Sequence, residues 1–249
     1  GLGDVYKRQP QEYLKEYPIF CVPLVVTSGT ESYRDNIDIT VETIYARQKN
    51  ENFKTSLPRP QDIEDVYSAI ARQGYTHVIV LMIAECLSSA NNLMRLAAEE
   101  LDAAAQVTII DSENLSTGIG LLVVEAAIMA EQGHSAAEIT AAVRELIPKV
   151  RASFVVDTLV YLWRGGRCNA VAALAGSALR LHPKIVVENG AMHATKKYRG
   201  KIDNAIMSYV KDMEADLKAA RPERVFITHS GCSREVVEEV RSYLKGLTA

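Results

Sequence analysis

The chain lacks the marks of several large classes of protein. Its four cysteines are far apart and form no C-x-x-C pair, which argues against a disulfide framework and against a cysteine zinc site. No apolar run reaches the roughly 18 residues that a membrane-spanning helix needs. No signal peptide is visible at the start. We therefore predict a cytoplasmic protein without a membrane span, with free thiols at Cys21, Cys86, Cys168 and Cys232.

Common catalytic motifs are also missing. The sequence has no Walker A loop, no G-x-S-x-G elbow and no H-E-x-x-H, and its five histidines lack metal-ligand spacing. Gly118-Ile119-Gly120 opens like a dinucleotide fingerprint, but Val123 occupies the place of the third glycine. A net charge of −3 and an aromatic content of 6% argue against nucleic-acid binding. We expect no metal, no cofactor and no nucleic-acid partner.

What the first 150 residues do show is an alternation of apolar β-rich runs and helical patterns. This alternation predicts βαβ units, and so an N-terminal domain over residues 10–150 with a parallel sheet and flanking helices. Loops are expected around Gly29, Asp35 and Asn36 and at Thr55-Ser56-Leu57-Pro58. The expected strands are residues 19–27, 77–83 and 106–111, and the expected helices are 40–48, 61–72, 88–101, 117–131 and 136–150.

Residues 151–249 predict a second α/β domain. Asn189-Gly190 is a strong hairpin signal between two apolar segments, 183–187 and 191–195. The other expected strands are 154–157 and 225–228, and the expected helices are 159–164, 170–181, 201–219 and 234–245.

Two pairs of hydroxyl side chains lie beside expected helix starts. Thr55-Ser56 precedes one helix, and Ser88-Ser89 begins another directly after an apolar strand. Ligands of open α/β sheets bind at the carboxyl ends of strands, where free N–H groups favour an anion. These hydroxyls are therefore candidates to bind a carboxylate. The alternative, that they are ordinary N-caps, stays open.

Basic residues gather in an otherwise acidic chain. Glu188 is the only acid among residues 180–201, which carry six Lys or Arg residues including Arg199, and Arg164 and Arg167 precede this run. Gly165-Gly166 presents Arg167 on a turn. This part favours a docking surface for an acidic partner or a phosphate, although a solvated face explains it as well.

The order of these motifs resembles the DegV family of bacterial fatty-acid-binding proteins over about residues 20–229. Seven pieces carry the resemblance: Pro23-Leu24 with Tyr33-Arg34-Asp35, Thr55-Ser56-Leu57-Pro58, Leu87-Ser88-Ser89, Ile110-Asp111-Ser112, Thr158-Leu159 with Leu162 and Gly165-Gly166-Arg167, Pro183, and Tyr198-Arg199-Gly200.

The resemblance implies a two-domain fold that encloses one long-chain fatty acid between its domains. In that family, hydroxyls of the Thr-Ser loop and of the Ser-rich helix start bind the carboxylate, which assigns Thr55, Ser56, Ser88 and Ser89 here. Some members present the acid to a separate fatty acid kinase. Arg167, Arg164 and Arg199 would then dock this partner. The expected function is a carrier with no chemistry of its own. An α/β enzyme or regulatory protein acting on a phosphorylated metabolite or nucleotide is the alternative.

The chain also departs from the family pattern. It lacks the usual first strand ending in Thr-Asp-Ser and the usual final His-Gly-Pro-Gly, so we expect a chain truncated at both ends with an incomplete second domain. Residues 1–9 read as foreign sequence. Residues 84–90 hold fewer hydroxyls than the family's Ser-Ser-x-Leu-Ser-Gly-Thr and add Glu85, whose charge would repel a bound carboxylate.

Overall fold

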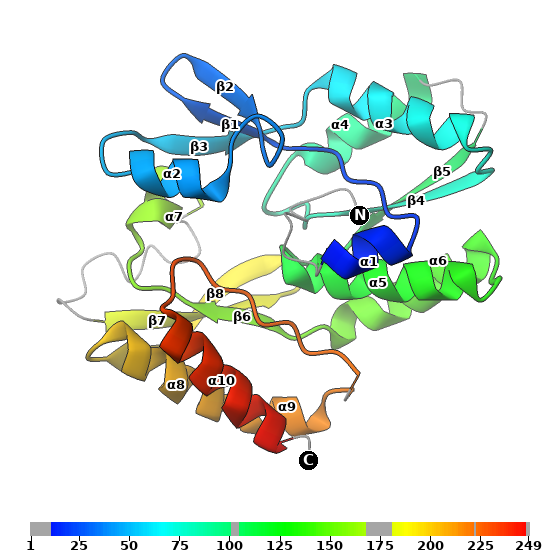
Figure 1. The fold of residues 1–249 in the computed structure, drawn as a ribbon. Helices are drawn as coiled ribbons and strands as arrows, with labels where there is room; N and C mark the ends of the chain where they lie inside the picture. Colours follow the sequence, from blue (N-terminus) through cyan, green and yellow to red (C-terminus); the bar gives the residue numbers. More distant parts are fainter. Residues whose placement is uncertain (1–10, 101–104, 168–180, 222, 248–249) are drawn as a thin grey trace. The chain divides into compact units, whose positions relative to one another are not determined.

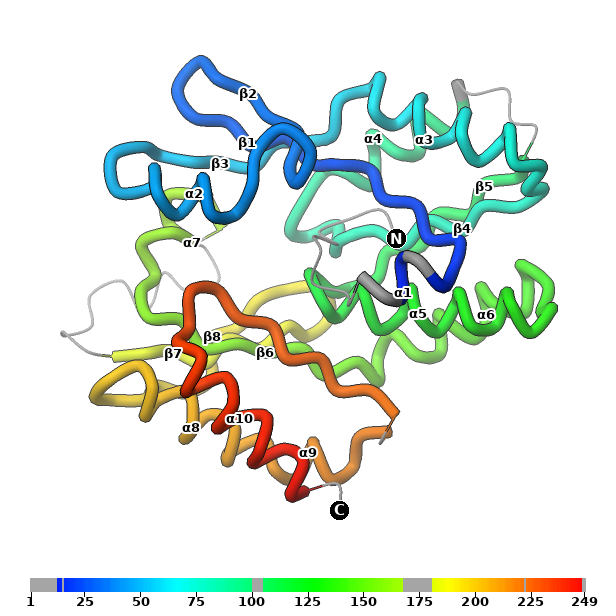
Figure 2. Tube along the Cα trace, in the orientation of Figure 1, coloured from blue at the N-terminus to red at the C-terminus, as the bar shows by residue number. Residues whose placement is uncertain are grey.

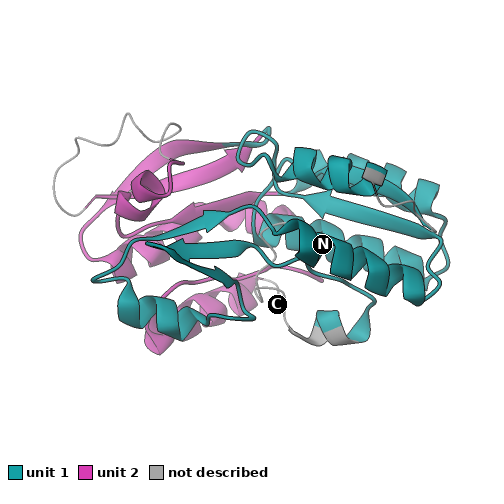
Figure 3. Ribbon diagram, turned by 90° about the horizontal axis from the view of Figure 1, so that it is seen from above, with its two compact units in different colours: residues 1–150, 189–191 teal, residues 151–188, 192–249 magenta. Residues whose placement is uncertain are grey.

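The computed structural model describes residues 11–100, 105–167, 181–221 and 223–247 (Figure 1). The chain divides into two compact units, shown in two colours in Figure 3. Unit 1 consists of Gly1–Val150 with Asn189–Ala191, and unit 2 consists of Arg151–Glu188 with Met192–Ala249.

Unit 1 contains a parallel and an antiparallel sheet, and Figure 2 traces its chain from blue to green. Its strands are β1 (Val25–Ser28), β2 (Glu31–Arg34), β3 (Phe53–Ser56), β4 (His77–Met82) and β5 (Gln106–Asp111). Its helices are α1 (Gln11–Glu16), α2 (Val41–Arg47), α3 (Pro60–Arg72), α4 (Ala90–Glu100), α5 (Thr117–Glu131), α6 (Ala136–Leu146) and the 3₁₀ turn η1 (Ile147–Lys149).

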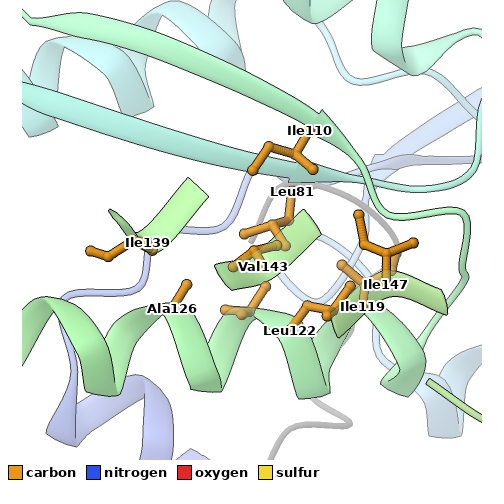
Figure 4. Packing of buried hydrophobic residues seen from close by; sticks show 9 residues of the cluster. Leu81, Ile110, Ile119, Leu122, Ala126, Ile139, Val143 and Ile147 are labelled. Carbon is orange, nitrogen blue, oxygen red and sulfur yellow. The ribbon is translucent and has the colours of Figure 1, made fainter. Parts of the chain in front are cut away.

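The parallel pair of β4 and β5 is covered on both faces. Alternate residues of a strand point to opposite faces, and Leu81 packs with α5 and α6 while Val80 and Met82 pack with α3 and α4. Figure 4 shows the first of these clusters, in which Val143 of α6 is fully buried. Each such side chain contributes about 1.5–3 kcal/mol by leaving water. The predicted parallel sheet with flanking helices is confirmed.

The antiparallel sheet, with strand order β2-β1-β3, corrects three expectations. The first strand begins at Val25 and not at residue 19. Pro23 explains this difference, because proline has no N–H to give to a ladder. The loop expected around Gly29 contains a strand, β2, because Gly29 adopts a φ of +58° and closes a tight hairpin with β1.

The third correction concerns the segment expected to be a loop at residues 55–58. Thr55 and Ser56 are the last residues of strand β3, and they pair with Val26 and Val25 of β1. A ladder uses backbone groups, so short polar side chains do not prevent it when a neighbouring strand is available.

Arg47 at the end of α2 forms hydrogen bonds and ion pairs that connect the parts of this small sheet. Its Nε and Nη2 donate to the Glu51 carboxylate at 2.7 Å, and Nη1 donates to the Tyr33 hydroxyl at 3.0 Å. Nη2 also donates to Glu31 at 2.6 Å, and the guanidinium lies 5.6 Å from the Phe53 ring centroid. The guanidinium holds the pKa of Glu51 below its usual value. One cation thus joins α2, β2, β3 and the α2–β3 loop.

Unit 2 is built on an antiparallel sheet with strand order β6-β7-β8. The Asn-Gly turn predicted at residues 189 and 190 is confirmed, with positive φ at both positions. The elements are β6 (Ala152–Val155), α7 (Val160–Arg164), β7 (Leu181–Glu188), β8 (Ala191–Arg199), α8 (Ile202–Asp212), α9 (Glu214–Ala219) and α10 (Arg234–Leu247).

Two predictions for this unit are wrong, and one lies outside the described residues. The helix expected over 201–219 is two helices that meet at Met213. Residues 225–228 lie outside the strands; Val225 and Ile227 are exposed, so their alternation does not mark a buried sheet face. The helix expected at 170–181 falls almost wholly on residues that the structure does not describe.

Two tyrosines, the buried Tyr198 and the partly buried Tyr209, fix α8 against the unit 2 sheet. The Tyr209 hydroxyl donates to the Ser153 carbonyl at 2.8 Å, and the Tyr198 hydroxyl donates to Asp212 Oδ2 at 2.7 Å. Burial raises the pKa of both phenols above its usual value.

Candidate functional site

A single turn of chain follows the carboxyl end of β4. The amide of Leu87 donates to the Ala84 carbonyl at 2.9 Å, and the amide of Ser88 donates to the same carbonyl at 3.2 Å. Residues 84–88 therefore form one turn, in which Glu85 and Ser88 are neighbours three positions apart. We call residues 84–89 the serine turn.

Ser88 and Ser89 lie just before α4, which starts at Ala90 and not at residue 88 as expected. The Ser88 Oγ accepts from the Ala90 amide at 3.2 Å, and the Ser89 carbonyl accepts from the Asn92 amide at 3.1 Å. Ser88 therefore satisfies the N–H of the first residue of α4, from one position before the N-cap position. A hydroxyl that accepts in this way still has its own proton to donate to a ligand oxygen.

The other hydroxyl pair, Thr55 and Ser56, is exposed at the end of β3. Leu57, the next residue, packs against the cluster that contains Ala90, Met94 and Tyr67. Ala90 opens α4 directly after the serine turn. Both hydroxyl pairs therefore adjoin the same apolar cluster of unit 1.

Asn91 of α4 holds the residue that precedes the serine turn, a role that no sequence motif indicated. Its side chain is only 1% exposed, and Nδ2 donates to the Ile83 carbonyl at 2.7 Å. Its Oδ1 has no hydrogen-bond partner among the described residues. The bond fixes the chain where it leaves β4. The sequence feature that could have pointed to this role is the polar pair Asn91-Asn92 within an amphipathic helix.

The loop after β5 contains a second set of buried, hydrogen-bonded polar residues at the same edge of the parallel sheet. Ser112 is fully buried, and its Oγ accepts from the Asn114 amide at 3.1 Å. The Asn114 carbonyl accepts from the Ala84 amide at 2.9 Å, which joins this loop to the serine turn. Glu113 and Ser116 adopt positive φ values of 50° and 49°. Non-glycine residues rarely hold this conformation, and when they do they concentrate at functional sites.

Asp111 links the same two segments. Its Oδ1 accepts from the Glu113 amide at 2.9 Å, and its Oδ2 accepts from the Glu85 amide at 3.3 Å. Neither bond caps a helix, since α5 begins at Thr117 with Ser116 in the N-cap position. Gly118 and Gly120, which resembled part of a dinucleotide fingerprint, are buried in the first turn of α5.

Glu85, the extra acid of the serine turn, forms an ion pair. Its Oε1 accepts from Arg95 Nη2, and Arg95 Nη1 donates to Asn92 Oδ1 at 3.3 Å. Both charged side chains are about half exposed, at 45% and 47%. The Glu85 carboxylate therefore has a cation on α4.

The arginine-bearing turn of unit 2 has the geometry expected from its two glycines. Gly166 adopts a φ of +75°, and the Arg167 amide donates to the Leu162 carbonyl at 3.0 Å, which closes α7 in a Schellman-type end. A Cβ on Gly165 would lie 3.3 Å from the Tyr161 carbonyl oxygen. Arg167 is exposed, and its Nη1 donates back to the Gly165 carbonyl at 2.6 Å.

The other two candidate docking arginines are also exposed. Arg164 lies at the end of α7, with its guanidinium 6.0 Å from the Tyr161 ring centroid. Arg199 is the last residue of β8. Val160, Tyr161 and Trp163 of α7 are exposed as well, at 45%, 55% and 69%. The surface beside Arg164 is therefore both aromatic and cationic.

Within the described part of the chain, no group of three or more His, Cys, Asp or Glu side chains is arranged to hold a metal ion. Over the same residues, no helix is long and apolar enough to span a bilayer. The described thiols, Cys21, Cys86 and Cys232, are free, and Cys168 lies outside the described residues.

Fold and site together define an α/β protein whose candidate site consists of hydroxyls, a helix start and buried amides, a chemistry suited to an oxygen ligand. The model of the DegV family, described as uncharacterised, matches residues 6–248. The chain belongs to this family.

Individual relatives agree with that assignment. A DegV domain-containing protein from Clostridium acetobutylicum is 33% identical over 231 residues, which cover 92% of this chain and 80% of the relative. A fatty-acid-binding DegV family protein from Thermus thermophilus is similar in structure, with a TM-score of 0.74, 30% identity and coverage of 87% and 76% of the two chains. A stearic acid-binding protein from Eubacterium ventriosum matches with a TM-score of 0.78 and 26% identity, over 98% and 87%.

Proposed function

We propose that this protein binds one long-chain fatty acid and carries it without changing it chemically. The acyl chain would be enclosed, and the carboxylate would be bound by the hydroxyls of Thr55, Ser56, Ser88 and Ser89. The observation that carries the proposal is the serine turn at the carboxyl end of β4, in a chain whose relatives from Thermus thermophilus and Eubacterium ventriosum bind fatty acids.

The local geometry supports a carboxylate at this place. A carboxylate accepts hydrogen bonds only, and the serine turn offers hydroxyl donors beside the first N–H groups of α4. The α4 helix has 11 residues, so its dipole favours negative charge at this end.

We further propose that Arg167, with Arg164 and Arg199, docks a partner fatty acid kinase. The support is the exposure of these three cations and the glycine-fixed turn that presents Arg167. A positive surface speeds the encounter with an acidic partner, and salt weakens this effect.

Mass spectrometry of an organic extract of the purified protein tests lipid binding directly. The expected result is one fatty acid per chain. In the delipidated protein, Thr55→Ala with Ser88→Ala should weaken binding about tenfold, since each neutral hydrogen bond contributes about 0.5–1.5 kcal/mol. The matched control is Thr140→Ala with Ser208→Ala, which removes the same groups from helices α6 and α8. Equal affinity of both double variants would contradict the assigned site.

A second experiment tests docking. Arg167→Ala should leave lipid binding unchanged and slow phosphorylation of the bound lipid by the kinase, most clearly at low salt. The control is Arg234→Ala, an exposed arginine at the start of α10. Loss of lipid binding and of stability in Arg167→Ala would show a structural role instead.

A further inference from the structure

We infer that Arg95 determines the affinity of the proposed site for anionic ligands, by neutralising Glu85 in the serine turn. This inference rests on the proposed function. Its observation is independent of the relatives: a carboxylate, Glu85, lies beside the candidate hydroxyl of Ser88, and a cation of α4 is paired with it.

The position of Glu85 makes its charge relevant to a ligand. The hydrogen bonds from the Leu87 and Ser88 amides to the Ala84 carbonyl close one helical turn, so Glu85 and Ser88 are neighbours on that turn. Cβ atoms of such neighbours are about 5–6 Å apart. A carboxylate bound by the Ser88 hydroxyl would therefore lie close to the Glu85 carboxylate.

The surrounding charges at this edge are mostly acidic. Asp111 accepts from the Glu85 amide, and Glu113 is exposed in the following loop. Arg95 of α4 forms an ion pair with Glu85, and it also donates a hydrogen bond to the Asn92 side chain on the same helix. Without Arg95, a ligand carboxylate would lie near a Glu85 carboxylate that has lost this cation.

The magnitude follows from Coulomb's law. Two unit charges about 6 Å apart in a water-like dielectric change a binding constant about threefold, and a lower dielectric increases this factor. Because both side chains of the ion pair are about half exposed, the water-like dielectric applies to it. The effect should shrink as salt rises, because the Debye length is about 10 Å at 0.1 M.

The test compares delipidated variants in binding palmitic acid and hexadecanol, which share an acyl chain length but differ in charge. Arg95→Gln should lower the affinity for the acid about threefold or more at low salt and leave the affinity for the alcohol unchanged. Glu85→Gln should raise the affinity for the acid. The double variant should return to the wild-type value, because both charges are then gone.

A matched control is Arg72→Gln, which removes the same charge from the end of α3. This residue precedes β4, whereas the serine turn follows it, and the six residues of β4 span about 20 Å. The control should bind both ligands as the wild type does.

The outcomes separate the two claims. Wild-type protein that binds neither ligand would overturn the proposed function and this inference with it. Wild-type binding with an Arg95→Gln variant that keeps full affinity for the acid would overturn the inference alone. Equal losses for acid and alcohol, or a double variant that does not recover, would assign Arg95 a structural role and overturn it as well.

Discussion

Asn91→Ala tests whether the buried amide below the serine turn supports this part of the fold. Asn91 is 1% exposed, and its Nδ2 donates to the Ile83 carbonyl at 2.7 Å. The substitution removes the donor and leaves a buried carbonyl without a partner. It also removes an Oδ1 that has no hydrogen-bond partner among the described residues, which offsets part of the loss.

The magnitude combines these effects. A buried acceptor left unsatisfied costs about 1–3 kcal/mol. The shortened side chain leaves a small void, which adds to this cost, and removal of the desolvated Oδ1 returns part of it. We expect a net loss of about 2 kcal/mol. Asn91→Asp should cost more, about 3 kcal/mol or above, because a buried carboxylate would face the Ile83 oxygen.

Urea unfolding of the delipidated protein measures this loss through the transition midpoint, with an unchanged slope. Asn92→Ala is the matched control, since Asn92 is exposed and its change should stay within about 0.5 kcal/mol. Equal stability of the two alanine variants, or an Asn91→Asp variant as stable as Asn91→Ala, would refute the reasoning.

Three further predictions concern other parts of the molecule. Hydrogen bonds from Arg34 lower the pKa of Asp38 from 3.8 to about 2. The stability that this pair contributes is therefore present above about pH 4 and is lost as the pH falls toward 2. Asp38→Asn should therefore make the free energy of unfolding less dependent on pH between about pH 4 and 2. Tyr209→Phe should cost about 1–2 kcal/mol in thermal unfolding, because it leaves a carbonyl of β6 without its donor. Gly166→Ala should cost about 1–2 kcal/mol, since its φ is +75°, whereas Gly246→Ala in α10, with open space around it, should be neutral or stabilising by up to about 1 kcal/mol.

The sequence predicted well those elements whose signal is local. β4 is a nearly continuous apolar run, and α5 is a long apolar segment that ends before Gly133. α6 begins at the N-cap Ser135, whose reciprocal hydrogen bonds with Glu138 form a capping box. The Asn-Gly turn was equally clear. In each case the deciding residues are neighbours in the chain.

The elements that the sequence did not predict depend on distant partners. β3 forms because Thr55 and Ser56 pair with β1, and the local sequence pattern does not indicate that this partner strand is present. The reverse holds at Val225 and Ile227, where an alternating pattern forms no strand. In both segments, strand formation depends on whether a partner strand is available and not on the β-propensity of the residues.

The candidate site was predicted only in part, for the same reason. Ser88 and Ser89 follow an apolar strand, so their place at a sheet edge could be foreseen. The partnership of Glu85 with Arg95 could not, because it depends on how the serine turn meets the following helix. The roles of Asn91 and Asn114 also required knowledge of their burial.

The contacts of Arg47 have a consequence for how this protein can change over evolutionary time. Its guanidinium is shared by Glu31, Glu51 and Tyr33, and Glu51 in turn accepts from the Ser28 hydroxyl at 2.7 Å. Loss of the arginine alone would leave two carboxylates facing one another without a cation. Substitutions at these positions are therefore expected to arise together, so that among relatives the small antiparallel sheet keeps or exchanges this set of side chains as a whole.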